Sequence, residues 1–384
     1  MSNLIKLLPD HIANQIAAGE VIQRPASVVK ELVENAVDAG ATKIEIHIKD
    51  AGRTLIQIID NGSGMSLFDA AMCFERHATS KLHTADDLFK LTTKGFRGEA
   101  LASIAAIAHV NLKTCQVDDE LGTEILVEGS EIKKNEPVVC PVGTNFEIKN
   151  LFFNVPARRN FLKSDIVEFK HILNEFHRIV IPHHETHFIL TQNGETIHNL
   201  PPANLRKRII DLNGRNYTDR MVPVNESTDI VEINGFVCKP EFAKKSRGEQ
   251  YLFVNNRFFK DSYFNNAVTR AFENLLQKST YPGYYIFLTV DPEKIDVNVH
   301  PTKTEIKFEE DKFIYSILFS AIKEGLGKFN VMPSLDFEAE TSFDVPQSVK
   351  SGFAHQPEIK VNSNYNPFTA KPTNSFSSNK SPSP

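Results

Sequence analysis

Three polar residues recur at helical spacing soon after Pro25 and could together handle a metal ion and a phosphate. Glu31, Asn35 and Asp38 stand at i, i+4 and i+7, which aligns them along one stripe of a helix. A carboxylate can act as a general base, and an amide oxygen suits a hard cation such as Mg²⁺. A solvated helix face would have the same spacing, so the stripe alone leaves both interpretations open.

A second candidate group follows an expected strand. Asp60 comes directly after the β-branched run 55–59, and Gly62 and Gly64 follow it. Glycines permit positive φ and let a planar ligand approach the backbone closely. A hairpin turn is the alternative, because Asn-Gly is a strong turn signal, but no second alternating strand continues after Met65.

Two later segments combine glycines with basic residues. They span residues 76–81 and 94–100, and the second leads directly into a helical pattern. Backbone N–H groups at such a helix start can bind phosphate oxygens. Residues 325–329 lack the ends of a P-loop, and residues 62–67 lack the third glycine of a dinucleotide fingerprint. Nucleotide binding would therefore be of another type.

The elements that position these groups form two blocks. Alternating or β-branched residues predict strands, and apolar residues at helical spacing predict helices. In the first block the strands are at 43–49, 55–59 and 144–148, with helices at 25–40 and 101–108; in the second, from about residue 216, the strands are at 230–239, 251–254 and 284–290, with helices at 267–277 and 313–329. We predict two α/β domains, 1–210 and 211–335.

The last 49 residues, 336–384, differ in composition. They hold nine serines and six prolines, and their apolar residues are scattered without a period. Such a segment cannot bury enough apolar surface to offset its ordering entropy, which indicates a disordered linker. Because a linker leads somewhere, we expect the chain to be a fragment that lacks a C-terminal domain.

Composition excludes several classes of protein. With 41% hydrophobic and 24% charged residues the 384-residue chain is globular, and no apolar run reaches the ~18 residues of a membrane span. The net charge of -5 argues against a wholly basic coat protein, but residues 201–280 hold 13 Lys or Arg against 9 Asp or Glu. That excess suits salt-sensitive, sequence-independent contact with DNA phosphates, with Arg257, Lys260 and Arg270 as contributors.

The motifs together resemble a known family. The nucleotide motifs of the GHKL ATPases are similar to Glu31-x-x-x-Asn35, Asp60-x-Gly62-x-Gly64, the segment 95–100 and Gly143-Thr144. Within that group, residues 16–21, 24–35, 76–81 and 296–301 resemble the MutL family of DNA mismatch repair proteins, and the resemblance covers about residues 4–330. It implies an α+β fold: a Bergerat-type two-layer sandwich, then a smaller α/β domain with a left-handed β-α-β crossover.

The resemblance also implies roles for single residues. Glu31 would be the general base that activates water, although Glu34 stands close enough to be mistaken for it, and Asn35 would hold Mg²⁺. Asp60 would accept a hydrogen bond from the adenine of ATP. The other implied ATP contacts are Gly64, Thr144, and a lid and phosphate cradle of Thr79, Ser80, Gly95, Phe96, Arg97 and Gly98.

For five further residues the sequence leaves two roles open. Lys303 would reach the γ-phosphate from the second domain, unless it is an ordinary surface lysine. Arg76 and Lys81 could touch the nucleotide or brace their loop. Arg158 and Arg159 could contact DNA or start a helix.

The function that the resemblance implies is a slow, switch-like ATPase of bacterial mismatch repair. ATP would close a homodimer into a clamp on DNA, and the clamp would couple a MutS-like mismatch sensor to a helicase or endonuclease. The protein would be cytoplasmic and nucleoid-associated, without a membrane partner. Two alternatives stay open: another GHKL ATPase, such as a type II topoisomerase subunit, and a non-hydrolysing scaffold gated by nucleotide.

Overall fold

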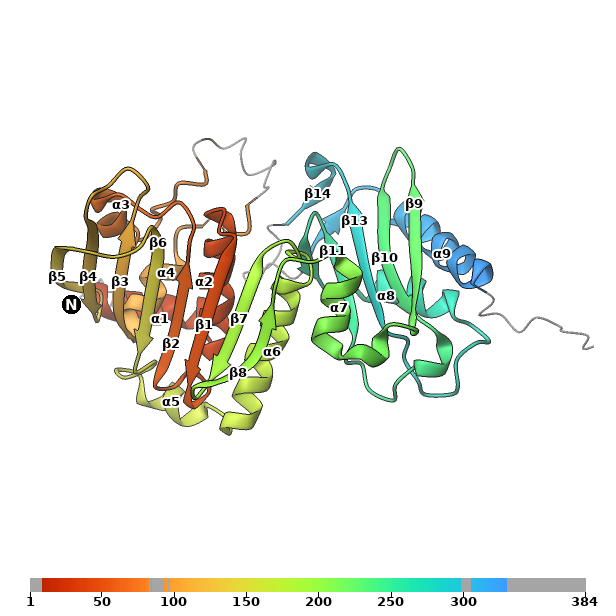
Figure 1. Ribbon diagram of the computed structural model, residues 1–384, viewed down its shortest axis with the longest axis horizontal. Coiled ribbons are helices and arrows are strands. Elements are labelled where there is room, and N and C mark those ends of the chain that lie inside the picture. The colour runs from red at the N-terminus through yellow and green to blue at the C-terminus, as the bar shows by residue number, and fades with distance from the viewer. Residues whose placement is uncertain (1–8, 83, 85–92, 96, 298–304, 330–384) are drawn as a thin grey trace, which may run out of the picture. The chain divides into compact units, whose positions relative to one another are not determined.

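The computed structural model describes residues 9–82, 84, 93–95, 97–297 and 305–329 (Figure 1). These residues form an α+β fold on two main sheets, of eight and of five strands. A short antiparallel pair, β14 (Ile295–Asp296) and β15 (Lys307–Phe308), forms a further small sheet. The segment 336–384, predicted as a linker, lies outside the described residues.

The larger sheet forms because its strands alternate apolar and polar residues. In β1 (Lys43–Lys49) the side chains of Ile44, Ile46 and Ile48 are buried, and the residues between them are partly exposed. The strand order is β5-β4-β3-β6-β2-β1-β7-β8, and every neighbouring pair is antiparallel except β1 with β7. The other strands are β2 (Leu55–Asp60), β3 (His109–Cys115), β4 (Gly122–Glu128), β5 (Glu131–Val138), β6 (Gly143–Lys149), β7 (His187–Gln192) and β8 (Glu195–Leu200).

Helices cover one face of this sheet (Figure 1). The central one, α2 (Pro25–Asp38), begins at a proline, whose fixed φ suits the first helical turn. Val29, Leu32 and Val33 of α2 are buried in the core, so the stripe with Glu31 and Asn35 is turned away from it. The other helices of this half are α1 (Asp10–Val21), α3 (Leu67–Met72), α4 (Ala100–Ile107), α5 (Pro156–Phe161) and α6 (Asp165–Val180).

The smaller sheet has the order β12-β11-β13-β10-β9, with helices on both faces. β11 pairs in parallel with β13, and the chain between them passes through α8, which makes a β-α-β crossover. α8 and α9 share one hydrophobic cluster with the sheet, while α7 contributes Ile209 to a cluster on aromatic side chains of the sheet. The bounds are α7 (Leu205–Asn213), β9 (Met221–Ser227), β10 (Glu232–Cys238), β11 (Gln250–Val254), β12 (Arg257–Phe259), α8 (Ser262–Ala271), β13 (Tyr284–Thr289) and α9 (Asp311–Lys328).

One predicted helix is displaced. Periodicity placed a helix at 267–277, whereas α8 begins at Ser262 and ends at Ala271. The Asp261 carboxylate accepts the N–H groups of Tyr263 and Phe264, which starts the helix earlier, and Asn274 at φ 71° lies outside helical geometry. The predicted domain boundary at residue 210 falls within α7, between the two main sheets, and stays a prediction.

Candidate functional site

Lys81 binds two of the candidate side chains on α2. Its Nζ donates hydrogen bonds to Asn35 Oδ1 at 2.9 Å and to Asp38 Oδ2 at 2.6 Å. The i, i+4, i+7 stripe is therefore not simply a solvated helix face, because at least two of its members hold a cation. An amide oxygen that already faces a positive charge also suits Mg²⁺.

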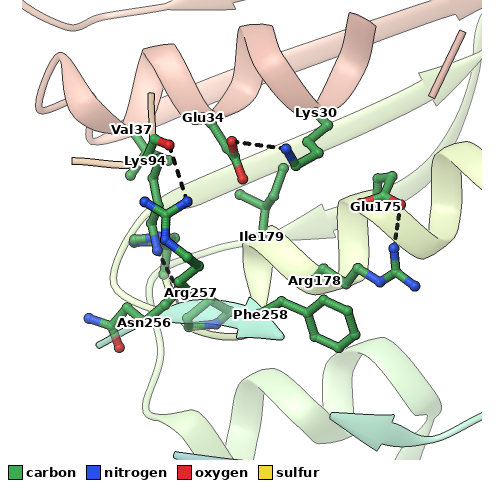
Figure 2. Close-up of a pocket in the computed structure, with 12 residues that line it drawn as sticks. Lys30, Glu34, Val37, Lys94, Glu175, Arg178, Ile179, Asn256, Arg257 and Phe258 are labelled. Atoms are coloured by element: carbon green, nitrogen blue, oxygen red, sulfur yellow. Dashed lines mark hydrogen bonds and ion pairs between the residues drawn. The ribbon is translucent and has the colours of Figure 1, made fainter. Parts of the chain in front are cut away.

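Lys30 separates the two carboxylates that compete for the role of general base. Its Nζ lies 2.9 Å from Glu31 Oε1 and 3.5 Å from Glu34 Oε2. Burial disfavours the charge on Lys30, but attraction to these carboxylates prevails and raises its pKa. The Glu34 side chain is 11% exposed and lines a cavity beside α6 (Figure 2), whereas the Glu31 side chain is 16% exposed and lies on the stripe of Asn35. This arrangement favours Glu31 as the base.

The cavity beside Glu34 is too small for a nucleotide. Its volume is about 30 Å³, enough for one or two water molecules. Figure 2 shows it between α2, α6 and residues 256–258 of the second half of the chain. It is a packing gap between elements, and the candidate nucleotide residues lie elsewhere.

Asp60 is a buried acceptor at the end of β2. Its side chain is 8% exposed, and Oδ1 accepts the N–H of Gly62 at 2.8 Å. Burial raises the pKa of the Asp60 carboxyl to about 6, against the opposing hydrogen bonds from the backbone of Gly62 and Thr144. Burial and backbone hydrogen bonds, and no cation among the described residues, determine the pKa of this carboxylate, so a neutral donor such as an exocyclic amino group suits it.

Thr144 and Gly64 belong to the same corner of the fold. Thr144 pairs with Asp60 across β6 and β2. Thr114 joins them: its hydroxyl donates to the Gly143 carbonyl at 3.0 Å and accepts the Met65 N–H at 2.9 Å. Gly64 has φ 68°, and a Cβ there would lie 2.0 Å from the Cys115 carbonyl oxygen, so no side chain fits.

The end of α2 meets this corner directly. The Ser63 N–H donates to the Ala39 carbonyl at 3.0 Å, one residue beyond α2. A Cβ on Gly62 would lie 2.9 Å from the Cβ of Ala39. The structure therefore brings the Asp60 group and the Asn35 group to the same end of α2.

Lys94 and Gly95, in the glycine-rich segment 94–100, also contact α2. The Asp38 carboxylate accepts the N–H of Lys94 at 3.0 Å and that of Gly95 at 3.1 Å. The Cα of Gly95 is so close that an added Cβ would lie 3.4 Å from Asn35 Oδ1. Gly95 thus stands beside the proposed metal ligand.

The loop before Lys81 packs against the other end of the same segment. The His77 N–H donates to the Gly98 carbonyl at 3.0 Å, and Gly98 adopts φ 60° within contact of Ala78. The Thr79 hydroxyl accepts the backbone N–H of Lys81 at 3.1 Å. Ser80 is exposed and Arg97 partly buried in this region. Phe96 and Lys303 lie outside the described residues.

The predicted DNA contacts separate into three groups. Arg159, Lys260 and Arg270 are exposed. Arg158 is partly buried and donates to the Ile22 carbonyl at 3.3 Å. Arg257 is 8% exposed and donates to the carbonyls of Thr93 and Lys94, so the prediction that it contacts DNA is wrong: its guanidinium is used within the protein.

Sequence reasoning missed several residues of the site. Lys94 is 8% exposed, and burial together with repulsion from Arg257 lowers its pKa to about 8. Thr114 is 1% exposed at the centre of the Asp60 corner. Thr114 has no local signal. Lys94 stands in the glycine-rich segment 94–100, but no role was predicted for it, because its partner Asn256 lies far away in the sequence. Asp38 was identified on the stripe of Asn35, but its hydrogen bonds with the backbone of Lys94 and Gly95 were not predicted.

Two family models match the chain. The model described as histidine kinase-, DNA gyrase B- and HSP90-like ATPase matches residues 23–149, and the model described as DNA mismatch repair protein, C-terminal domain, matches residues 209–327. The DNA mismatch repair protein MutL of Flavobacterium psychrophilum is 58% identical over 368 residues, covering 96% of this chain and 60% of the relative. That of Bacteroides fragilis is 52% identical over 375 residues, covering 98% and 60%. The chain spans about three fifths of the length of these relatives.

Solved structures share the fold. The N-terminal domain of a DNA repair protein is similar with a TM-score of 0.71 and 23% identity, covering 83% of this chain and 99% of that one. The Aquifex aeolicus MutL ATPase domain complexed with ADP is similar with a TM-score of 0.54 and 23% identity, covering 78% and 98%. At this identity the likeness shows the fold alone.

Proposed function

The chain belongs to the MutL family of DNA mismatch repair proteins, and on that premise we propose that it binds and hydrolyses ATP to switch a dimeric clamp on DNA. One observation carries the proposal. Asn35, Gly95 and the Asp60 corner converge on the same end of α2, although they come from three separate segments. A base-binding acceptor, a metal ligand and a phosphate-binding backbone are the three parts that an ATP site needs.

The adenine end is the Asp60 corner. The buried carboxylate would accept a hydrogen bond from the adenine amino group, and Gly64, whose close approach to the Cys115 backbone excludes a side chain, would help to shape the pocket for the ring. Thr144 would support the same pocket through its pairing with Asp60. Guanine carries a carbonyl at the corresponding ring position, so the acceptor of Asp60 would select ATP.

The phosphate end is the stripe on α2. Asn35 would hold Mg²⁺ through Oδ1, and the bound ion would neutralise charge on the phosphate oxygens. Glu31 would orient and deprotonate the attacking water. Thr79, Ser80 and residues 95–98 would form the lid and phosphate cradle, and backbone N–H groups other than that of Gly95, which donates to Asp38, would face the phosphates. Lys303 would reach the γ-phosphate from the second half and report the nucleotide there.

The nucleotide would act through assembly. Slow hydrolysis would make the protein a switch, closing a homodimer when ATP binds and reopening it afterwards. DNA would be held without sequence preference by exposed basic residues, of which Arg159, Lys260 and Arg270 stay candidates. A MutS-like sensor and a helicase or endonuclease would be the partners, in the bacterial cytoplasm near the nucleoid.

The relatives named as mismatch repair proteins favour this function over a topoisomerase subunit. The presence of Glu31 on the stripe favours hydrolysis over a non-hydrolysing scaffold. No helix among the described residues has the length and apolar character for crossing a bilayer.

Sedimentation velocity tests the proposed switch. The protein is expected to sediment faster, as a dimer, with Mg²⁺ and a non-hydrolysable ATP analogue than without nucleotide. Asn35→Ala is expected to show no shift, because it lacks the metal ligand. An equal shift for both proteins, or none for the unmodified chain, would contradict the proposal.

A further inference from the structure

We call residues 93–95 the lid anchor. Asp38 of α2 binds the lid anchor through its backbone. The Asp38 carboxylate accepts the N–H of Lys94 through both oxygens, at 3.0 and 3.1 Å, and the N–H of Gly95 at 3.1 Å. Charge-assisted bonds of this kind are about twice as strong as neutral ones. Asp38 therefore fixes the backbone next to Asn35.

The lid anchor is also held from the second half of the chain. Arg257, the first residue of β12, donates through one nitrogen to the Thr93 carbonyl at 2.7 Å and through another to the Lys94 carbonyl at 3.2 Å. The Lys94 ammonium in turn donates to the carbonyl of Asn256, which precedes Arg257 (Figure 2). The turn between β11 and β12 and the lid anchor thus exchange hydrogen bonds in both directions.

Because this contact is buried, its two positive charges need compensating negative charge nearby. The side chains of Arg257 and Lys94 are each 8% exposed, so two cations lie beside one another away from solvent. Glu34 and Asp38 supply the compensating negative charge to both. A lysine in place of Arg257 would keep the charge but could not offer two fixed N–H groups to two successive carbonyls.

We propose that Arg257 is a positioning residue for the ATP site: with Asp38 it clamps the lid anchor, so that the second half of the chain helps to set where Gly95 lies relative to Asn35. This inference rests on the proposed ATP site. Arg257 does not touch the reacting atoms. It acts on nucleotide through the backbone of residues 93–95, and a shift of that backbone would move Gly95 relative to Asn35.

The test compares Arg257→Lys with Arg215→Lys, the same change at an exposed arginine of the second half. Loss of one charge-assisted hydrogen bond corresponds to a change of about tenfold, so Arg257→Lys is expected to raise the KM for ATP by about that factor. Its kcat at saturating ATP is expected to stay within about twofold. Arg215→Lys is expected to change neither constant.

A second readout needs no nucleotide. Hydrogen–deuterium exchange of the peptide that contains residues 93–95 is expected to accelerate in Arg257→Lys and in Asp38→Asn, but not in Arg215→Lys or in Asp229→Asn, an exposed control. Should Arg257→Lys fail to fold, Lys94→Met removes the contact with Asn256 and is expected to accelerate the same exchange.

The outcomes are separable. Unchanged KM and unchanged exchange in a folded Arg257→Lys would overturn the clamp, as would an equal loss of kcat and thermal stability without a change in KM. If the unmodified protein does not bind ATP, the proposed function fails, and the exchange comparison alone decides whether the clamp exists.

Discussion

The ammonium of Lys81 lies 2.9 Å from Asn35 Oδ1, the atom that the proposed mechanism gives to Mg²⁺. The same ammonium lies 2.6 Å from Asp38, which holds the lid anchor. A protein cation and a metal ion cannot both occupy the same side of one amide oxygen. Binding of Mg²⁺ would therefore require Lys81 to move. This movement would break its contact with Asp38, the residue that also binds the lid anchor.

Replacing Lys81 tests this competition. Lys81→Met is expected to lower the Mg²⁺ concentration for half-maximal ATP binding by about three- to tenfold, because the competing hydrogen bond is absent. Fluorescence titration with a labelled ATP analogue across a Mg²⁺ series measures it. Lys49→Met, at an exposed lysine, is the control. A higher or unchanged Mg²⁺ requirement for Lys81→Met would rule out the competition.

Glu31 and Glu34 can be separated by turnover. Glu31→Ala is expected to keep ATP binding and lose hydrolysis by about 10²–10⁴-fold, since it removes the general base. Glu34→Gln keeps the size of a side chain that lines the cavity in Figure 2, and its rate is expected to stay within a few-fold. Phosphate release at saturating ATP is the measurement. The assignment is reversed if Glu34→Gln is the slower enzyme.

Asp60 predicts a pH dependence of nucleotide affinity. Its folded pKa, about 6, is raised above the ordinary value by burial, so the carboxylate form is costly in the free protein and is lost as the pH falls through 6. Adenine would bind the carboxylate form, so ATP affinity is expected to weaken below pH 6. Titrations between pH 5 and pH 8 test this. Affinity that is independent of pH over that range contradicts the assigned acceptor.

The raised pKa of Asp60 also makes the stability of the fold depend on pH. Because the folded pKa of Asp60 exceeds the ordinary value of 3.8, the folded protein binds the proton more tightly than the unfolded chain does. The contribution of Asp60 to the free energy of unfolding is therefore greatest below pH 4 and declines as the pH rises to 6. Asp60→Asn is expected to flatten this part of the stability profile measured by urea unfolding. A profile that keeps its slope in the variant would contradict the shift.

Removing the Thr114 hydroxyl at the adenine end is expected to lower the stability of the fold. Thr114→Val keeps the shape of the side chain but removes the hydrogen bonds of an almost fully buried hydroxyl with Met65, Gly143 and Thr144. The free energy of unfolding is expected to fall by about 1–3 kcal/mol. Thr196→Val, on an exposed position of β8, should leave it nearly unchanged. Urea unfolding of both variants decides.

DNA binding is expected to depend on salt and not on sequence. If Lys260 and Arg270 neutralise phosphates, replacing either by alanine should reduce the slope of log affinity against log salt by about one. Filter binding with two unrelated duplexes measures both properties. A strong preference for one duplex would point to base readout.

Periodicity predicted only part of the elements: in the larger sheet, β1, β2 and β6 correspond to predicted strands, and the other five strands were not predicted. The alternation in 43–49 and the amphipathic pattern after Pro25 predicted β1 and α2 closely, because burial of one face determines both. α8 was misplaced because Asp261, a capping residue, determines its start more strongly than the apolar pattern does.

The site was only partly predictable. Asn35 and Asp60 were found because each stands in a local pattern, but Lys81 meets Asp38 across 43 positions and Arg257 meets Thr93 across 164. Such contacts arise from packing of separate elements, and no spacing rule encodes them. Arg257 was misinterpreted for this reason: the basic excess of residues 201–280 pointed to DNA, whereas burial directs this guanidinium to the lid anchor.

The central claim is that Asn35 and Asp60 belong to one nucleotide site. Isothermal titration of a non-hydrolysable ATP analogue with Mg²⁺ into the unmodified chain, Asn35→Ala and Asp60→Asn tests it most directly. We predict one site per chain for the unmodified protein, with binding lost in Asn35→Ala and strongly weakened in Asp60→Asn. No heat of binding in the unmodified protein, or unchanged affinity in both variants, would contradict the account.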